Sequence, residues 1–220
     1  MNIELAYQLL VCAGKRNIIN EYGQEMYVAI KKISDAKLKE ILPKIPKLKN
    51  SHFDFNYKFI VAYVPIYYAF KQFDETTNDA DRLLWMMNEE LLRKIPRYIL
   101  RLIGRLSLNK SLKKKQKALQ KSGEEGLLDP LDFKIQVIEC DDGSYFCNFV
   151  ECGAYKVLKM IGEDYVFPSA CRVDYLVANL SELKFERNKT IADGDDCCNN
   201  HIMGRGYTEW SPEKGFINRR

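Results

Sequence analysis

The chain changes character near residue 126, and this change constrains the fold more than any other feature. Before it, apolar residues recur at helical spacing; after it, short alternating segments between turn signals favour strands. Residues 1–126 hold 23 basic and 14 acidic side chains, whereas residues 127–220 hold 11 and 16. We therefore expect an α+β protein, in which a basic helical half packs on a small antiparallel sheet with helices of its own. The two regions are expected to form one compact domain.

The helical half contains several amphipathic segments. Apolar spacing predicts helices over residues 3–13 and 26–42, the second ending before a proline. Residues 53–73 are rich in aromatic and β-branched residues, which would also suit strands. Their length and lack of turn signals favour a helix kinked at Pro65. Two further helices are expected, one from a cap at Asn78 or Asp79 to Arg93 and one that opens at Pro96.

A lysine-rich stretch, residues 109–126, separates the two regions. It carries six lysines and ends in Gly123-Glu124-Glu125-Gly126. Such a run is typical of a solvated helix face or a mobile linker, and we interpret it as the linker. No aromatic residues interleave the lysines, so a stacking platform for nucleic acid is absent and no nucleic-acid partner is expected.

The second region alternates strand and helix patterns. A turn at Asp141-Asp142-Gly143 joins two strand-like segments, and a turn at Asp193-Gly194-Asp195 joins two more. The tail after Gly204 is expected either to dock Tyr207 or Trp210 on the body or to fray. The predicted elements are strands over 133–139, 145–150, 183–192 and 197–203, and helices over 153–161 and 169–180.

Seven cysteines and the absence of a signal-like start point to a reducing compartment. The count is odd, so one chain cannot pair them all, and we expect free thiols in a cytoplasmic protein. The longest apolar run, residues 59–70, is too short to cross a bilayer, so no membrane partner is expected. A small-molecule substrate is the expected partner, and a homo-oligomer is possible.

The densest chemical segment runs from Glu186 to His201. On a strand, side chains alternate faces, so Asp196, Cys198 and Asn200 would share one face and His201 would lie on the other. Three carboxylates at the turn need a neutralising partner, which solvent alone can supply. The plainer interpretation is therefore a solvated turn followed by a buried cysteine that packs as a small apolar residue.

A second pair, Cys171 and Asp174, lies three residues apart on a predicted helix and so shares one face. The carboxylate could orient a substrate amine or relay a proton, although alone it would raise the pKa of the thiol. Arg172 would act in the opposite direction. The alternative is a core cysteine beside a surface acid. No C-x-x-C pair exists and the separations are long, so neither a metal nor another cofactor is expected.

Together these residues resemble the L-2-amino-thiazoline-4-carboxylic acid hydrolase family. The likeness rests on Cys152, on the C-x-x-D-Y step at Cys171, and on the motif from Glu186 through Gly194 to Cys198, over about residues 145–202. Where the family has C-D-F, this chain has Cys198-Asn199-Asn200, which removes a possible base and an aromatic packing anchor. Small-molecule-binding domains of the 4-vinyl reductase type end in a similar hairpin.

The resemblance implies hydrolytic opening of a cyclic amidine to a carbamoyl-cysteine-type product. It implies a nucleophile or an activator of water, a partner for the ring nitrogen and a cation for the carboxylate. The alternatives are a non-catalytic binding module or a tailoring enzyme on the same scaffold. The roles fall as follows: nucleophile, Cys171 or Cys198; acid or base, Asp174 or Asp196; carboxylate clamp, Arg187 or Arg172; further substrate contacts, Thr190, Cys152 and His201.

Overall fold

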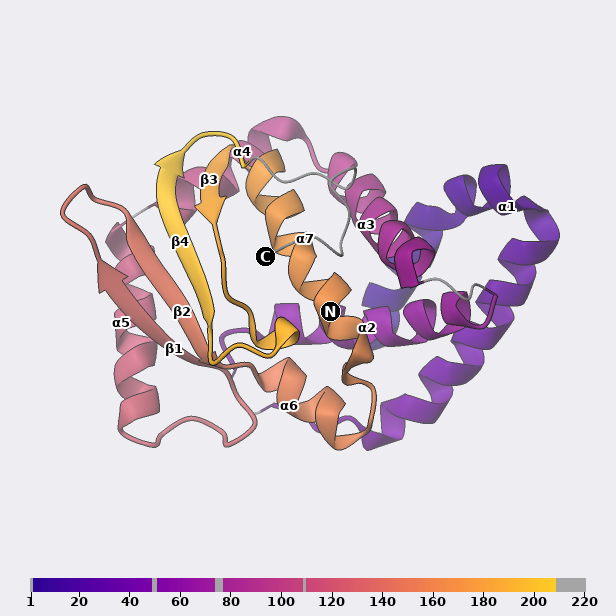
Figure 1. Cartoon of the computed structure of the whole chain (residues 1–220), viewed down its shortest axis with the longest axis horizontal. Helices are drawn as coiled ribbons and strands as arrows, with labels where there is room; N and C mark the ends of the chain where they lie inside the picture. Colours follow the sequence, from indigo (N-terminus) through magenta and orange to yellow (C-terminus); the bar gives the residue numbers. More distant parts are fainter. Residues whose placement is uncertain (1, 49–50, 74–76, 109, 209–220) are drawn as a thin grey trace.

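The computed structural model describes residues 2–48, 51–73, 77–108 and 110–208. Helices make up the first half of the chain, and every strand lies after residue 130, as the sequence predicts. Figure 1 shows the sheet at one side of the molecule and α1 at the other, with α7 between them. The helices of the first half are α1 (Ile3–Ile41), α2 (Asp54–Lys71), α3 (Thr77–Arg93), α4 (Arg97–Ser107) and α5 (Lys110–Glu124).

The two predicted N-terminal helices are the two arms of α1. Gly23 interrupts the helix with φ 87° and ψ 164°, a conformation that a residue with a Cβ rarely adopts. The first arm buries Tyr7, Leu10 and Ile18 against the rest of the core. The Tyr7 hydroxyl bonds with Ser34 in the second arm at 2.6 Å, which ties the arms together.

Helix α2 confirms the helical interpretation of residues 53–73. Pro65 lies inside it and is buried, and it has no N–H to donate to the helix carbonyl four residues earlier. Two of its tyrosines donate hydrogen bonds within the helical half: Tyr63 to Asn88 at 2.8 Å and Tyr67 to Asp81 at 2.9 Å. The proposed caps of α3, Asn78 and Asp79, have side chains outside the described part of the structure.

The interpretation of residues 109–126 as a linker is wrong: most of them form helix α5. Leu119 is buried against Ile135 and Tyr145 of the sheet, and Gln120 accepts a hydrogen bond from the Val137 N–H at 2.8 Å. Lys114, Lys115, Lys117 and Lys121 are exposed, and Lys117 pairs with Glu139 at 3.0 Å. Of the two forms that the charge run suggested, a solvated helix face and a mobile linker, the structure shows the helix.

The sheet is fully antiparallel, with strand order β1-β2-β4-β3. Its strands are β1 (Lys134–Glu139), β2 (Tyr145–Glu151), β3 (Leu183–Glu186) and β4 (Cys198–Arg205). The predicted strand over 183–192 is therefore too long. The chain leaves the sheet after Glu186 and forms a short 3-10 turn, Ile191–Asp193, before it returns in β4.

Helices cover one face of the sheet, which gives the α+β fold. Helix α6 (Gly153–Met160) follows β2, and α7 (Phe167–Leu180) packs Tyr175 against Phe185 of β3 at a ring separation of 5.1 Å. Residues of β2 and β4 alternate, so Cys147 and Cys198 face the helices while Phe146 and His201 face outward. One apolar core contains residues of both halves, from α1, α2 and α3 to α6 and α7.

The tail turns back along β3. Thr208 is buried and bonds to the backbone of β3 at both Leu183 and Phe185, whereas Tyr207 is 61% exposed. Trp210 lies outside the described residues. Among the helices that the structure describes, none is long and apolar enough to cross a membrane.

Close packing of α4 on α7 predicts a large effect of one methyl group. A Cβ at Gly104 would lie 2.1 Å from the carbonyl oxygen of Ser181, so the backbone itself must move. We expect Gly104→Ala to lower the free energy of unfolding by about 1–3 kcal/mol. At Gly123 of α5 a Cβ meets only the side chains of Leu128 at 3.4 Å and Lys134 at 3.8 Å, so Gly123→Ala should be neutral or stabilise by up to about 1 kcal/mol. Urea unfolding of both variants tests this, and equal stabilities would contradict it.

Candidate active site

Arg187, just after β3, is the buried centre of the candidate site. Its side chain is 1% exposed, and it donates one hydrogen bond to Asp174 at 2.8 Å and another to the Cys171 carbonyl at 2.6 Å. The guanidinium lies over the rings of Tyr175 and Phe185, at 5.3 and 5.7 Å from their centres. These contacts fix the Asp174 carboxylate, whose side chain remains 51% exposed. Arg187 therefore holds the solvent-accessible carboxylate of Asp174 in a fixed position.

Three thiols from different elements lie near one another: Cys152 from the start of α6, Cys171 from α7 and Cys198 from β4. Burial raises the pKa of Cys171 far above its ordinary value, Arg187 lowers it, and Cys198 and Cys152 raise it further. Burial also raises the pKa of Cys152 to about 12, opposed by the backbone N–H groups of Tyr155 and Ala154. Both thiols are therefore protonated at neutral pH.

Cys198 has a different environment, because its sulfur faces hydrogen-bond donors. The backbone N–H of Ile191 donates to the sulfur at 3.3 Å, and the Thr190 hydroxyl lies at the same distance. Thr190 is buried, and its own N–H is held by Asp195 at 2.8 Å, so the loop that carries these donors is fixed. Of the three cysteines, Cys198 is the one we consider best placed to react.

The structure separates Asp196 from Cys198. β4 begins at Cys198, so the alternation of faces does not extend back to Asp196. The Asp196 side chain is 76% exposed and pairs with Lys189 at 3.1 Å, and these contacts lower its pKa. The expectation that Asp196 shares an inward face with Cys198 is therefore wrong, and the carboxylate that accompanies the thiols is Asp174.

Arg172 lies on another side of α7 and belongs to a buried polar network. It donates to the Pro168 carbonyl and lies 3.7 Å from Asp193. Its charge also lowers the pKa of the nearby Asp81, although burial, the larger effect, raises it. Asp81 accepts hydrogen bonds from Tyr67 and Ser169. Arg172 thus ties α7 to the turn that contains Asp193, and neither arginine is positioned as a carboxylate clamp for a substrate.

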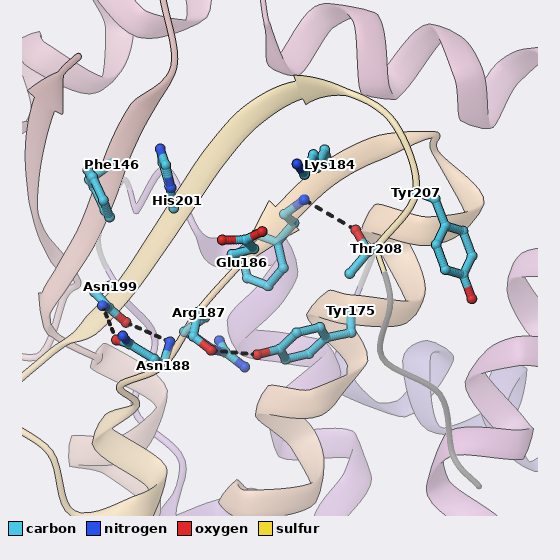
Figure 2. A pocket seen from close by; sticks show the side chains of 11 residues that line it. Phe146, Tyr175, Lys184, Glu186, Arg187, Asn188, Asn199, His201, Tyr207 and Thr208 are labelled. Carbon is cyan, nitrogen blue, oxygen red and sulfur yellow. Dashed lines mark hydrogen bonds between the residues drawn. The ribbon is translucent and has the colours of Figure 1, made fainter. Parts of the chain in front are cut away.

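His201 lies on the outer face of the sheet, opposite Cys198. Its ring stacks on Phe146 at 4.1 Å, and Nε2 bonds with Ser144 at 2.9 Å. A hollow of about 550 Å³ opens beside this pair, and its lining also includes Glu186 and Arg187 (Figure 2). The structure therefore brings together Cys152, Cys171, Cys198, Thr190, Asp174 and Arg187, and leaves out Asp196, Arg172 and His201.

Two residues near the thiols have no motif that marks them in the sequence. Tyr63 of α2 is 4% exposed, and its raised pKa is due to burial and then to the charge of Asp174. Asn200 faces the helices from β4, and its side-chain oxygen is buried with no hydrogen-bond partner in the described structure. Only its departure from the C-D-F ending draws attention to Asn200. The described residues contain no group of three or more potential metal ligands.

The environments of the cysteines predict their reactivity. All seven are free, and Cys12 is the exposed one. At pH 8 we expect iodoacetamide to modify Cys12 first, while Cys152 and Cys171 remain protected until the pH approaches their raised pKa values. Peptide mass spectrometry after short exposures measures this, with Cys12→Ser as the control that lacks the fast phase. Fewer than seven titratable thiols in the unfolded, unreduced protein, or rapid labelling of Cys171, would contradict it.

The fold and the site define an α+β protein that presents a cluster of thiols and one accessible carboxylate. A sequence model of the L-2-amino-thiazoline-4-carboxylic acid hydrolase family matches residues 58–202, from within α2 to within β4. This is well over half of the chain, and the protein belongs to that family. No curated protein sequence and no solved structure matches the chain significantly. The matched region includes every residue of the thiol cluster.

Proposed function

We propose that the protein is a cytoplasmic hydrolase that opens a small cyclic amidine ring of the thiazoline kind. The observation that carries the proposal is the placement of Cys171 and Cys198 beside Asp174, which Arg187 holds in position. An accessible carboxylate suits an amidine, because it can accept hydrogen bonds from both nitrogen atoms and stabilise the protonated form. The family name supplies the substrate class.

In this proposal Cys198 is the nucleophile. Its sulfur attacks the carbon between the ring sulfur and nitrogen, the bond from that carbon to the ring sulfur breaks, and the ring sulfur takes a proton to leave as a thiol. Water then adds to the same carbon of the covalent adduct, Asp174 accepts the proton of the water, and the Cys198 thiolate is released. The product is a carbamoyl group on the amine of the opened ring. The Thr190 hydroxyl and the Ile191 N–H contact the Cys198 sulfur and hold it in position.

Incubation with 2-aminothiazoline-4-carboxylate tests the proposal. The expected result is one product per substrate consumed, which carries both the released thiol and the new carbamoyl group, measured by mass spectrometry so that the protein thiols do not interfere. Rapid quenching should also trap a protein adduct on the peptide that contains Cys198. Turnover without an adduct would mean that water, and not Cys198, is the nucleophile. Binding without turnover would mean that the protein is a non-catalytic binding module.

That second class has one observation in its favour. Asn200 is directed into the region where the family has an aromatic residue, and its unpartnered side-chain oxygen could accept a hydrogen bond from a bound ligand. Asn200→Phe restores the family residue. If the protein is an enzyme for the family substrate, this variant should keep or raise turnover; if it is a binder adapted to another ligand, the variant should lose that ligand.

A further inference from the structure

Helix α4 presents an apolar stripe that the fold does not use. The helix meets α7 through Leu100 and Gly104, its two buried positions. The other large apolar side chains of α4 point away from the body. Their exposed fractions are Tyr98 71%, Leu102 51%, Leu106 51% and Ile103 43%. Large apolar side chains that are exposed next to one another usually mark an interaction surface.

A row of arginines borders the stripe. Arg97, Arg101 and Arg105 recur every four residues, one position before Tyr98, Leu102 and Leu106, so the two rows run side by side along the helix. Arg97 is 77% exposed and Arg101 is 45% exposed.

One acid neutralises part of this row. Glu182 pairs with Arg101 at 2.6 Å, with Arg205 at 2.8 Å and with Arg97 at 3.7 Å. One carboxylate for three guanidinium groups leaves the surface with a clear excess of positive charge.

The excess extends beyond α4. Residues 91–123 contain eleven lysines and arginines and no acidic residue at all. A hollow of about 570 Å³ beside the start of α4 is lined by Arg93, Lys94 and Arg97, with Glu182 as its one acidic residue, and basic residues outnumber acidic ones there. In Figure 1, α4 lies near the top of the view, behind β3.

We propose that α4 docks the protein on an anionic lipid surface. An amphipathic helix binds such a surface by placing its apolar side chains at the boundary of the acyl region while its basic side chains meet the headgroups. The α4 surface has both components in adjacent rows, and Tyr98 is the kind of aromatic residue that favours the interface. The helix lies on the membrane and does not span it. This inference is independent of the proposed reaction.

The charge pattern favours lipid over the other candidate partners. A second copy of the chain docked through α4 would bring two rows of arginines together, and like charges oppose such an interface. A nucleic acid would use the basic side chains but would leave the protruding stripe of Tyr98, Leu102 and Leu106 without a partner. An anionic membrane satisfies both rows at once.

Flotation with phosphatidylcholine vesicles, with and without about one third phosphatidylserine, tests the proposal. The full-length protein should float with the anionic vesicles only, and salt should weaken the binding. Leu102→Glu combined with Leu106→Glu should abolish flotation. The triple variant Arg97→Gln, Arg101→Gln, Arg105→Gln should bind about a hundredfold more weakly, at roughly fivefold per charge.

Leu127→Glu is the matched control, because Leu127 is 72% exposed but lies outside α4. It should float like the parent protein, and circular dichroism checks that all variants keep the fold. Binding to both vesicles alike, or to neither, would overturn the proposal. So would a dimer that the Leu102 and Leu106 substitutions dissociate, or salt-sensitive binding to duplex DNA in place of vesicles.

Discussion

Cys198→Ser should reduce turnover of the amidine substrate by about a thousandfold or more while the fold remains intact. Serine keeps the hydrogen bonds from Thr190 and the Ile191 N–H, so the loop geometry survives. The hydroxyl is far less ionised than a thiol and is a poor nucleophile without an adjacent base. We expect kcat to fall with little change in KM, because Cys198 acts in bond formation and not in substrate binding. Steady-state kinetics with product detection by mass spectrometry measures the effect.

The other cysteines supply the controls for this result. Cys12→Ser, on the exposed surface of α1, should leave kcat unchanged. Cys171→Ser removes a buried thiol next to the site, and its loss of activity should be smaller than that of Cys198→Ser, since Cys171 is protonated in the resting protein. If Cys171→Ser is the more damaging substitution, the nucleophile has been assigned to the wrong thiol. If neither matters, the site is elsewhere.

The elements that the sequence predicted are those with strong apolar periodicity. The helices around Leu10, Tyr63 and Leu84 bury continuous faces, and the strands around Ile135 and Cys147 alternate clearly. Helix α5 was only one of two alternatives for its charge run, because its packing depends on one leucine that meets a sheet formed later in the chain. The early end of β3 also has a remote cause. Asn199 of β4 accepts hydrogen bonds from the N–H groups of residues 188 and 189, which holds that stretch out of the sheet.

The candidate site was predicted only in part, for a similar reason. The three-residue spacing predicted that Cys171 and Asp174 lie on one helix face. The predicted turn at residues 193–195 returned the chain to the sheet, where Cys198 could face that helix. Spacing could not show that Arg187 is enclosed by Tyr175 and Phe185, because that depends on how α7 lies across β3. The same packing engages the guanidinium with Asp174 and so changes its expected role from a substrate clamp to a positioning group.

Because Arg187 positions Asp174, we expect its substitution to reduce turnover much more than it changes the free energy of unfolding. The guanidinium is buried while its partner carboxylate is half exposed, so the pair carries a large desolvation cost on one side only. Methionine fills a similar volume between Tyr175 and Phe185 without that cost, although the Cys171 carbonyl loses a donor. We therefore expect Arg187→Met to change the free energy of unfolding by no more than about 1–2 kcal/mol.

Turnover should nevertheless fall about a hundredfold or more in Arg187→Met, because the Asp174 carboxylate is no longer fixed beside the thiols. Arg187→Lys keeps the charge but cannot make both hydrogen bonds in the same geometry, and it should recover only part of the rate. An unfolded Arg187→Met would show that the arginine is needed for the fold itself. Full activity in a folded Arg187→Met would mean that Asp174 needs no partner to act, and the arrangement around Arg187 would then be structural alone.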